Sequence, residues 1–269
     1  MLFSIITPSL NCGSFISNNF NSIRKQGFGP DELEHWVIDG GSTDGTLDIL
    51  KREPGVKWIS EGDKGLSDAV NKGIQRATGD WIIWLNADDF LADDALKIFV
   101  EHTRKHPDVR VFSGDQTILR YDGSVEQTPK GWDYNLNDLL GVKTDVNQAS
   151  TFVHREVYQK VGLLDVSIRY AMDYEWTVRA MHHYRCAAIP HVLTFYRRRQ
   201  GSLMDAHMAK HFETFLAVRR KYNRPRLSRA DFRIRFYLCT EPLRRIRWLR
   251  HMVRKAKKLC GVPPLHPAN

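Results

Sequence analysis

Short apolar runs alternate with helix-like patterns through the first hundred residues, and this alternation limits the fold more than any other feature of the chain. Four of the runs are typical of buried strands, and apolar residues at helical spacing follow each of them. A strand–helix repeat of this kind predicts an α/β fold, with a mostly parallel sheet flanked by helices. The predicted strands cover residues 3–7, 35–39, 56–60 and 81–85.

After a fifth predicted strand at 109–113 the alternation becomes less regular. The dipeptide Asp122-Gly123 is a strong hairpin signal, whereas residues 129–147 read as irregular. Further elements are predicted as a hairpin, two helices and a strand, at 117–128, 155–161, 172–184 and 187–195. From residue 207 onward the chain is almost entirely helix-like. We therefore expect one domain over residues 1–205 and a basic helical extension over residues 206–269.

Three of the predicted strands end in turns that are rich in glycine and acidic residues, at 39–46, 61–65 and 86–89. Because parallel strands align their carboxyl ends, the three turns share one edge of the sheet. The last turn reads Asn-Ala-Asp-Asp, and adjacent carboxylates after a buried strand suit Mg²⁺ or Mn²⁺. Capping of the next helix by an Asp is the alternative interpretation. The convergence of the turns predicts a nucleotide-binding crevice with a metal ion.

Composition excludes several other classes of protein. No run reaches the ~18 consecutive apolar residues of a membrane span, and the first residues lack the basic region of a signal peptide. The four cysteines are scattered and form no CxxC pair, which fits neither a disulfide framework nor a zinc site. A reducing cytoplasm is the simplest setting for such a chain.

Several motifs together carry a family resemblance. They lie, in chain order, at residues 5–11, 22–26, 37–46, 63–73, 79–81, 85–89, 147–152 and 173–176. With these motifs the chain resembles the family 2 glycosyltransferases of the GT-A fold over roughly residues 3–200, and it is similar to bacterial colanic-acid and O-antigen transferases. The resemblance divides the domain into a nucleotide-binding half, residues 1–112, and an acceptor half, residues 113–205.

The resemblance also implies site roles at the matching positions. Asp173 matches the catalytic base of inverting members, and Asp88 matches the metal ligand that would hold Mn²⁺ or Mg²⁺ at the diphosphate. Asp39 is expected to contact the nucleobase, typically uracil, and Asp89 to contact the donor sugar. The full set of expected substrate-binding residues is Thr7, Pro8, Asn11, Asp39, Asp68, Lys72, Asn86, Asp89 and Gln148.

Two positions depart from the pattern of the family. Asn86 stands where the metal-binding motif often has its first Asp, which lowers the local negative charge, and Met172 precedes Asp173 where Glu is more usual. Glu175 is a weaker candidate for the base. On a helix it points about 200° away from Asp173, so the two side chains cannot face one site.

The implied function is an inverting, metal-dependent hexosyltransferase in cell-surface polysaccharide biosynthesis. Its partners would be a nucleotide-diphosphate sugar, with UDP as the expected nucleotide, and a glycan or polyprenyl-linked acceptor. Two alternatives come from other classes of protein. A non-catalytic nucleotide-sugar-binding scaffold would not need Asp88, Asp89 and Asp173, and a sugar-phosphate nucleotidyltransferase would need a glycine-rich phosphate loop, whereas residues 7–14 hold only Gly13.

Basic residues concentrate near the C-terminus, with 16 Lys and Arg against two acids between Arg219 and Lys258. Residues 243–260 alternate apolar and basic side chains at helical spacing, which is typical of a membrane-surface helix. We expect peripheral attachment to the inner face of the cell membrane. A helix packed on the domain with a solvated basic face is the alternative, and nucleic acid is not an expected partner. The run Arg197-Arg198-Arg199 is either a diphosphate contact, as in relatives, or a solvated charge run, and the scattered histidines are expected to pack or face solvent.

Overall fold

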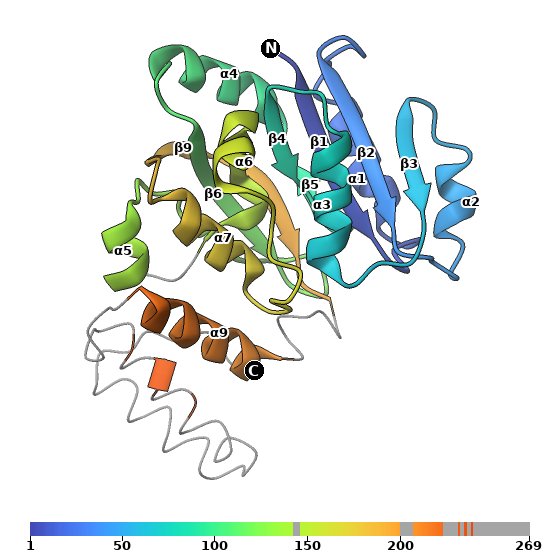
Figure 1. The fold of residues 1–269 in the computed structure, drawn as a ribbon. Coiled ribbons are helices and arrows are strands. Elements are labelled where there is room, and N and C mark those ends of the chain that lie inside the picture. The colour runs from blue at the N-terminus through green and yellow to red at the C-terminus, as the bar shows by residue number, and fades with distance from the viewer. Residues whose placement is uncertain (142–145, 200–206, 223–230, 232–233, 236–237, 239–269) are drawn as a thin grey trace.

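The computed structural model describes residues 1–141, 146–199 and 207–222, together with residues 231, 234, 235 and 238. In these residues the chain forms one nine-stranded sheet flanked by helices (Figure 1). The strand order is β3-β2-β1-β4-β8-β6-β9-β5, and β7 pairs with β6 off this path. The α/β class expected from the sequence is confirmed.

The first four strands are parallel neighbours. They are β1 (Phe3–Ser9), β2 (Leu33–Asp39), β3 (Val56–Ser60) and β4 (Trp81–Trp84). Ser9 pairs with Asp39, and Asp39 pairs with Ser60, so three strands end in register. Because β4 runs parallel to β1, its turn begins at the same edge, and the predicted gathering of the turns after β2, β3 and β4 is confirmed.

The second half of the sheet is mixed because one strand is inserted in the opposite direction. This strand, β8 (Thr151–His154), lies antiparallel between β4 and β6 (Val111–Leu119). β9 (Cys186–Arg197) is parallel to β6, so both run in the direction of β4. The short strands β5 (Phe90–Leu91) and β7 (Val125–Gln127) are antiparallel to β9 and β6. The sheet is thus mostly parallel, and pairing of β6 with β7 confirms the hairpin.

Helices cover both faces of this sheet (Figure 1). The helix that contains Gly73 packs closely on β1. This requires a glycine, because a Cβ at position 73 would lie 2.3 Å from Cγ2 of Ile6. The α-helices are α1 (Ile16–Arg24), α2 (Thr46–Leu50), α3 (Leu66–Arg76), α4 (Ala95–Lys105), α5 (Leu136–Gly141), α6 (Arg155–Val161), α7 (Met172–Ala180) and α9 (Met208–Lys221), and η1 (Gln148–Ser150) is a 3₁₀ turn.

Two expectations about the acceptor half were wrong. The strand expected at 109–113 continues to Leu119 and includes the first arm of the hairpin. The stretch 129–147, expected to be irregular, contains α5, whose Leu139 and Leu140 are buried. These two leucines pack in the same cluster as Tyr174 of α7, and this long-range packing stabilises a helix too short to be recognised from its local pattern.

Each face of the sheet has its own apolar core, because neighbouring side chains on a strand point to opposite faces. Ile6 of β1 packs in the cluster on the side of α3 and α7, and Ile5 packs in the cluster on the side of α4. The two cores hold the strand ends rigidly. The loops at the carboxyl edge can therefore carry a site on a fixed support.

The described part of the C-terminal extension packs against the domain. Val218 of α9 joins the core that includes α7, and the ring of Phe215 lies 4.8 Å from that of Tyr174. Arg219 is buried and forms a 3.0 Å ion pair with Asp231. The expected amphipathic helix at 243–260 lies outside the described residues. No helix in the described part of the chain is long and apolar enough to cross a membrane.

Candidate functional site

Asp39, at the end of β2, organises the first loop of the carboxyl edge. Its carboxylate is fully buried and accepts hydrogen bonds from the backbone N–H groups of Gly41 and Ser42 and from the hydroxyls of Ser42 and Ser60. Three of these bonds fix the loop after β2, and the bond from Ser60 ties the ends of β2 and β3 together. The expected contact of Asp39 with a nucleobase is not visible in this geometry, because both oxygens already hold the loop.

The loop after β1 is joined to the loop after β2 by several hydrogen bonds. The backbone N–H of Asn11 donates to Oγ of Ser42, and Oδ1 of Asn11 accepts from the N–H of Thr43 at 2.9 Å. The N–H of Gly13 donates to Asp44 at 2.9 Å. Asn11 is exposed and has a φ of 52°, a left-handed conformation that Asn tolerates better than most residues. It is a polar group presented at the edge, as expected.

Thr7 and Pro8, in contrast, lie inside the sheet. Both are buried, and Oγ1 of Thr7 lies 2.9 Å from Nε2 of His35 on β2. Burial lowers the pKa of His35 from its ordinary value of 6.5 to about 3, so this imidazole is neutral. The side chain of Thr7 thus supports the neighbouring strand rather than facing a ligand.

A carboxylate from the third loop lies over Gly40. A Cβ at Gly40 would lie 2.5 Å from Oδ2 of Asp63, so the absence of a side chain at position 40 is what makes room for Asp63. Oδ1 of Asp63 accepts a 2.8 Å hydrogen bond from the N–H of Gly65. Asp63 is half-buried at the edge where Asp39 was expected to act.

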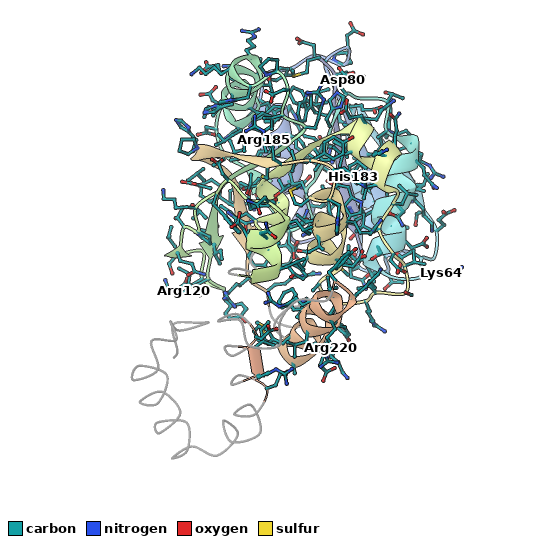
Figure 2. All side chains as sticks on the ribbon, turned by 60° about the vertical axis from the view of Figure 1, so that its left-hand side comes forward. Lys64, Asp80, Arg120, His183, Arg185 and Arg220 are labelled. Atoms are coloured by element: carbon teal, nitrogen blue, oxygen red, sulfur yellow. The ribbon has the colours of Figure 1, made fainter. Side chains whose placement is uncertain are left out.

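The first turns of α3 support the same loop. Nζ of Lys72 forms ion pairs with Glu61 at 3.0 Å and with Asp68 at 3.6 Å, and Asp68 accepts a hydrogen bond from the N–H of Lys64. Lys64 lies at this loop edge, and Asp80, before β4, lies at the opposite edge (Figure 2). Asp68 and Lys72 are therefore at the expected edge, held within the loop.

In the turn after β4 some polar side chains are buried and others are accessible. Asp89 is fully buried, and its oxygens accept from Nδ2 of Asn86 and from the backbone N–H of Arg197 at 3.0 Å each. Asn19 of α1 donates to the backbone oxygens of Asn86 and Asp89. Burial and the charge of Asp88 raise the pKa of Asp89 well above its ordinary value. Both oxygens of Asp89 thus bond within the protein, and its expected contact with the donor sugar stays a prediction.

Asp88 is the carboxylate of this turn that faces the edge, and it already has a cation. Its Oδ2 lies 2.9 Å from Nε of Arg199, and the side chains of Asp88 and Arg199 are 15% and 34% exposed. Burial raises the pKa of Asp88, and the Arg199 charge partly offsets this rise. The segment after β9 thus contacts the turn after β4 through this ion pair.

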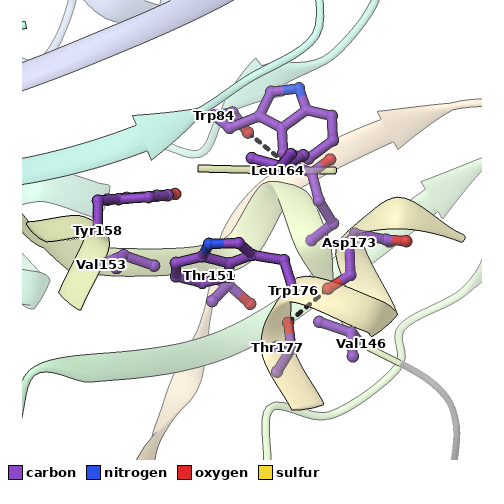
Figure 3. A pocket seen from close by; sticks show the side chains of 10 residues that line it. Trp84, Val146, Thr151, Val153, Tyr158, Leu164, Asp173, Trp176 and Thr177 are labelled. Atoms are coloured by element: carbon purple, nitrogen blue, oxygen red, sulfur yellow. Dashed lines mark hydrogen bonds between the residues drawn. The ribbon is translucent and has the colours of Figure 1, made fainter. Parts of the chain in front are cut away.

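Asp173 lines a cavity between the sheet and α7 (Figure 3). The cavity has a volume of about 30 Å³, enough for a water molecule. Aromatic and polar side chains surround it, and the lining residues are Trp84, Val146, Gln148, Thr151, Val153, Tyr158, Leu164, Asp173, Trp176 and Thr177. The expected residues Asp173 and Gln148 are therefore brought together.

Burial raises the pKa of Asp173, and a backbone hydrogen bond at Tyr174 and the positive form of His211 act in the opposite direction. A carboxylate with a raised pKa is a stronger base than an ordinary Asp. Glu175 is turned into the core, where both of its oxygens lie 3.0 Å from Nε of Arg179. The prediction that Glu175 and Asp173 cannot share a site is confirmed.

The protein donors near Asp88 do not complete a site for a divalent cation. Asp88 is paired with Arg199, Asp89 is buried, and Oδ1 of Asn86 accepts a 2.9 Å bond from the indole of Trp84. Among the described residues no three His, Cys, Asp or Glu side chains gather in a way that could hold a metal ion. Mg²⁺ and Mn²⁺ prefer several oxygen ligands, and here one carboxylate is accessible.

Sequence reasoning missed two residues of this site and left the role of a third open. Asp63 lay within a quoted motif but carried no role. Arg199 belonged to a run for which a diphosphate contact and a solvated charge run were both considered, and His211 was expected to pack or face solvent. The contacts that select them are with Gly40, Asp88 and Asp173. A glycine at 40 beside an acidic loop is a weak signal for the first. The charge run was the local signal for Arg199, whereas His211 left none, because its link to Asp173 joins segments that are distant in sequence.

Comparison with known proteins gives matches over much of the domain. The family model described as glycosyl transferase family 2 matches residues 4–162. A PGL/p-HBAD biosynthesis glycosyltransferase of Mycobacterium tuberculosis is 30% identical over 205 residues, which cover 72% of this chain and 73% of the relative. Chondroitin synthase of Escherichia coli is 36% identical over 179 residues, which cover 65% of this chain and 26% of the relative.

Solved structures share the fold. S. aureus TarS 1-349 in complex with UDP-GlcNAc has a TM-score of 0.66 at 18% identity, over 89% of this chain and 72% of that one. This chain spans 43% of a longer TarS chain. The mannosyltransferase PcManGT from Pyrobaculum calidifontis, in complex with GDP-Man and Mn²⁺, has a TM-score of 0.62 at 19% identity, over 97% of this chain and 75% of that one. At these identities the likeness concerns the fold.

Proposed function

Since the chain belongs to glycosyl transferase family 2, we propose that it moves a sugar from a nucleotide-diphosphate sugar, with UDP as the first candidate nucleotide, to a glycan or polyprenyl-linked acceptor in cell-surface polysaccharide biosynthesis. The observation that carries the proposal is the single edge where the ends of β1, β2, β3 and β4 meet beside Asp88 and the Asp173 cavity. The UDP-GlcNAc complex of a neighbour in fold supports the nucleotide. The synthase name of the E. coli relative supports a polymer as product.

The reaction we propose inverts the anomeric centre in one displacement. Asp173 takes the proton of the acceptor hydroxyl as its oxygen forms the new bond to the anomeric carbon. The bond from that carbon to the diphosphate breaks, and its electron pair leaves with the diphosphate. One base suffices for this step. The raised pKa of Asp173 and its position in an aromatic cavity support its choice over the ion-paired Glu175.

The leaving diphosphate gains negative charge and needs a cation beside it. Asp88 marks the place, because a carboxylate at the edge can hold a cation that also contacts the diphosphate. A divalent ion, Mn²⁺ or Mg²⁺, would supply that charge if diphosphate oxygens completed its ligands, and the Mn²⁺ complex of a solved neighbour supports this alternative. The guanidinium of Arg199 is the cation that the protein itself holds there.

In the nucleotide part of the site we assign contacts to the accessible polar groups. Asn11 is exposed at the end of β1, and Asp63 is half-buried over Gly40. Asp63 can accept from the N–H of a nucleobase, which is the role first expected for Asp39. Asp39 holds the loops that present both residues. Asp68 and Lys72 fix the Asp63 loop through their ion pair and the bond to Lys64.

Peripheral attachment to the inner face of the cell membrane is part of the proposal, through the basic residues after 240. The charge run of the sequence supports it. A test must keep the chain whole, because Asp231 pairs with the buried Arg219 and truncation would leave that charge unpaired. Replacing Arg244, Arg245, Arg247, Lys257 and Lys258 by Gln should abolish flotation with anionic liposomes, and unchanged flotation would contradict attachment through this segment.

The function is tested by nucleotide binding and donor turnover together. Thermal shift with UDP, GDP, ADP and CMP should single out one nucleotide, with UDP expected. The sugar donor that carries this nucleotide, a UDP-sugar if UDP is selected, should then be hydrolysed slowly without an acceptor. The rate of nucleotide release should rise when a glycan acceptor is added. If no nucleotide raises the melting temperature of the whole chain, the proposed function is wrong.

A further inference from the structure

The three consecutive arginines at the end of β9, Arg197 to Arg199, have three different environments. The guanidinium of Arg197 lies over the rings of Phe15 and Phe90, at 5.7 and 5.6 Å from their centroids. Arg198 forms a 2.6 Å ion pair with the buried Glu126 of β7. Arg199 pairs with Asp88. The run is therefore not a solvated patch, and it delivers one guanidinium to the carboxyl edge.

The position of Arg199 is fixed by the strand that carries it. The backbone N–H of Arg197 is bonded to Oδ1 of Asp89, which ties the end of β9 to the turn after β4. Two residues further, Nε of Arg199 reaches Asp88 at 2.9 Å, and its NH1 approaches Sγ of Cys12 at 3.7 Å. The guanidinium thus lies between the turn after β4 and the loop after β1.

A guanidinium at this place has the chemistry to bind a diphosphate. Arginine carries five N–H donors in a planar fork and matches phosphate oxygens in pairs. With Nε directed at Asp88, further N–H groups of the fork can donate to a second anion. Asp88 then orients the arginine, because a carboxylate that holds one edge of the fork aims the other edge.

The donors around Asp88 are poor for a metal and good for an arginine. A divalent ion would have to displace Arg199 from Asp88 and find further oxygen ligands, whereas Asn86 and Asp89 are engaged with Trp84 and with Arg197. Arg199 already binds Asp88 and needs no further oxygen ligands from the protein.

We propose that Arg199, held by Asp88, is the cation that binds the diphosphate of the donor and neutralises it as it leaves, so that neither donor binding nor transfer requires a divalent metal ion. This inference rests on the proposed function, because it assigns a residue to the diphosphate of that donor. It makes Asp88 the positioning residue for Arg199 instead of a metal ligand.

Calorimetric titration of the whole chain with UDP, in EDTA and in Mn²⁺, tests the inference. The wild-type Kd should differ by less than about threefold between the two conditions. Arg199→Gln should weaken binding at least tenfold in EDTA, and Arg199→Lys should weaken it less, because it keeps the charge but loses the fork. Addition of Mn²⁺ should restore part of the binding to Arg199→Gln, since Asp88 is then free to accept a metal.

A matched control removes the neighbouring arginine without leaving a buried charge. The double variant Arg198→Gln with Glu126→Gln should bind UDP like the wild type in both conditions, and melting temperatures of all variants establish that they are folded. Wild-type binding that appears only with Mn²⁺, or equal Kd values for wild type and Arg199→Gln in EDTA, would overturn the inference and leave the proposed function standing. Absence of any nucleotide binding by the wild type in both conditions would overturn both.

Discussion

The indole N–H of Trp84 donates a 2.9 Å hydrogen bond to Oδ1 of Asn86, and this bond joins the wall of the Asp173 cavity to the turn that carries Asp88. On the cavity side, Nε2 of Gln148 donates to the backbone oxygen of Trp84 at 2.6 Å. On the other side, Nδ2 of Asn86 donates to Asp89. One chain of hydrogen bonds thus links Gln148, which lines the same cavity as Asp173, to Asp89, the neighbour of Asp88.

This chain predicts that Asn86→Asp is destabilising, although an Asp is common at this position in relatives. The substitution removes the donor to Asp89 and places a second carboxylate beside a buried one. We expect a loss of about 1–3 kcal/mol in the free energy of unfolding at neutral pH, the cost of leaving a buried polar group unsatisfied. Urea denaturation of the whole chain measures it.

Asn86→Ala is the control for that prediction. It removes the donor to Asp89 and also the acceptor for the Trp84 indole, but it adds no charge, so it should cost less than Asn86→Asp. If Asn86→Asp is as stable as the wild type, the amide is not required as the donor to Asp89.

Asp173→Asn should remove transfer and keep donor binding. The amide has nearly the shape of the acid but cannot take a proton, and loss of a general base costs about 10²–10⁴ in rate. Calorimetric titration with UDP and a turnover assay, both on the same preparation, separate the two effects. A turnover rate within a few fold of the wild type would show that Asp173 is not the base.

The pH dependence of turnover should depend on His211. Asp173 must be deprotonated to act, and burial raises its pKa, so activity should fall at a higher pH than for an ordinary Asp as the solution is acidified. The positive form of His211 lowers that pKa, and Tyr134 is a further titratable group near Asp173. His211→Gln should therefore move the acid limb of the turnover profile to higher pH. A limb that stays in place would contradict the electrostatic link.

The two carboxylates near the nucleotide should respond differently to amide substitution. Asp63→Asn should weaken UDP binding several fold at an almost unchanged melting temperature, because Asp63 is half-buried at the edge. Asp39→Asn should lower the melting temperature clearly, because Asp39 accepts four hydrogen bonds from the loop after β2 and from the end of β3. If instead Asp39→Asn weakens UDP binding and Asp63→Asn lowers the melting temperature, the contact with the nucleobase belongs to Asp39. Both variants are measured by calorimetric titration and by thermal melting.

His35 should make the fold sensitive to mild acid. The unfolded chain protonates this imidazole below about pH 6.5, whereas the folded chain resists protonation down to about pH 3. Stability present above pH 6.5 is therefore lost as the pH falls, by up to about 1.4 kcal/mol per pH unit from this one group. Urea denaturation at several pH values between 6.5 and 4.5 measures the slope.

His35→Gln isolates that contribution, because Gln does not titrate. Its stability should vary less with pH over the same window, although its absolute stability is lower. Below pH 4.5 a second group acts in the same direction. Burial opposes ionisation of Glu34, but hydrogen bonds from Lys57, Ser4 and Thr78 outweigh it and lower its pKa to about 2, so its contribution is lost as the pH falls from 4.5 to 2. Equal slopes for wild type and His35→Gln between 6.5 and 4.5 would contradict the prediction.

Local pattern predicted the nucleotide-binding half well. The strands β1 to β4 and the helices between them were read from the period of apolar residues, and their parallel order placed the turns at one edge. In the acceptor half the same method missed α5 and the full length of β6. Both depend on partners far along the chain, which a short window of sequence does not contain.

The sequence by itself determined which chemistry is present, namely Asp39, Asp88, Asp89 and Asp173 on an α/β support. The support follows from local periodicity, and these carboxylates follow from residue type and from the motifs that carry the family resemblance. Only the tertiary structure decided which of these groups is accessible. Asp39 and Asp89 are enclosed by hydrogen bonds, and Arg199 pairs with Asp88 although the two are far apart in sequence. The physical reason is that burial, and the cost of leaving a buried charge unpaired, depend on every segment that packs around a group.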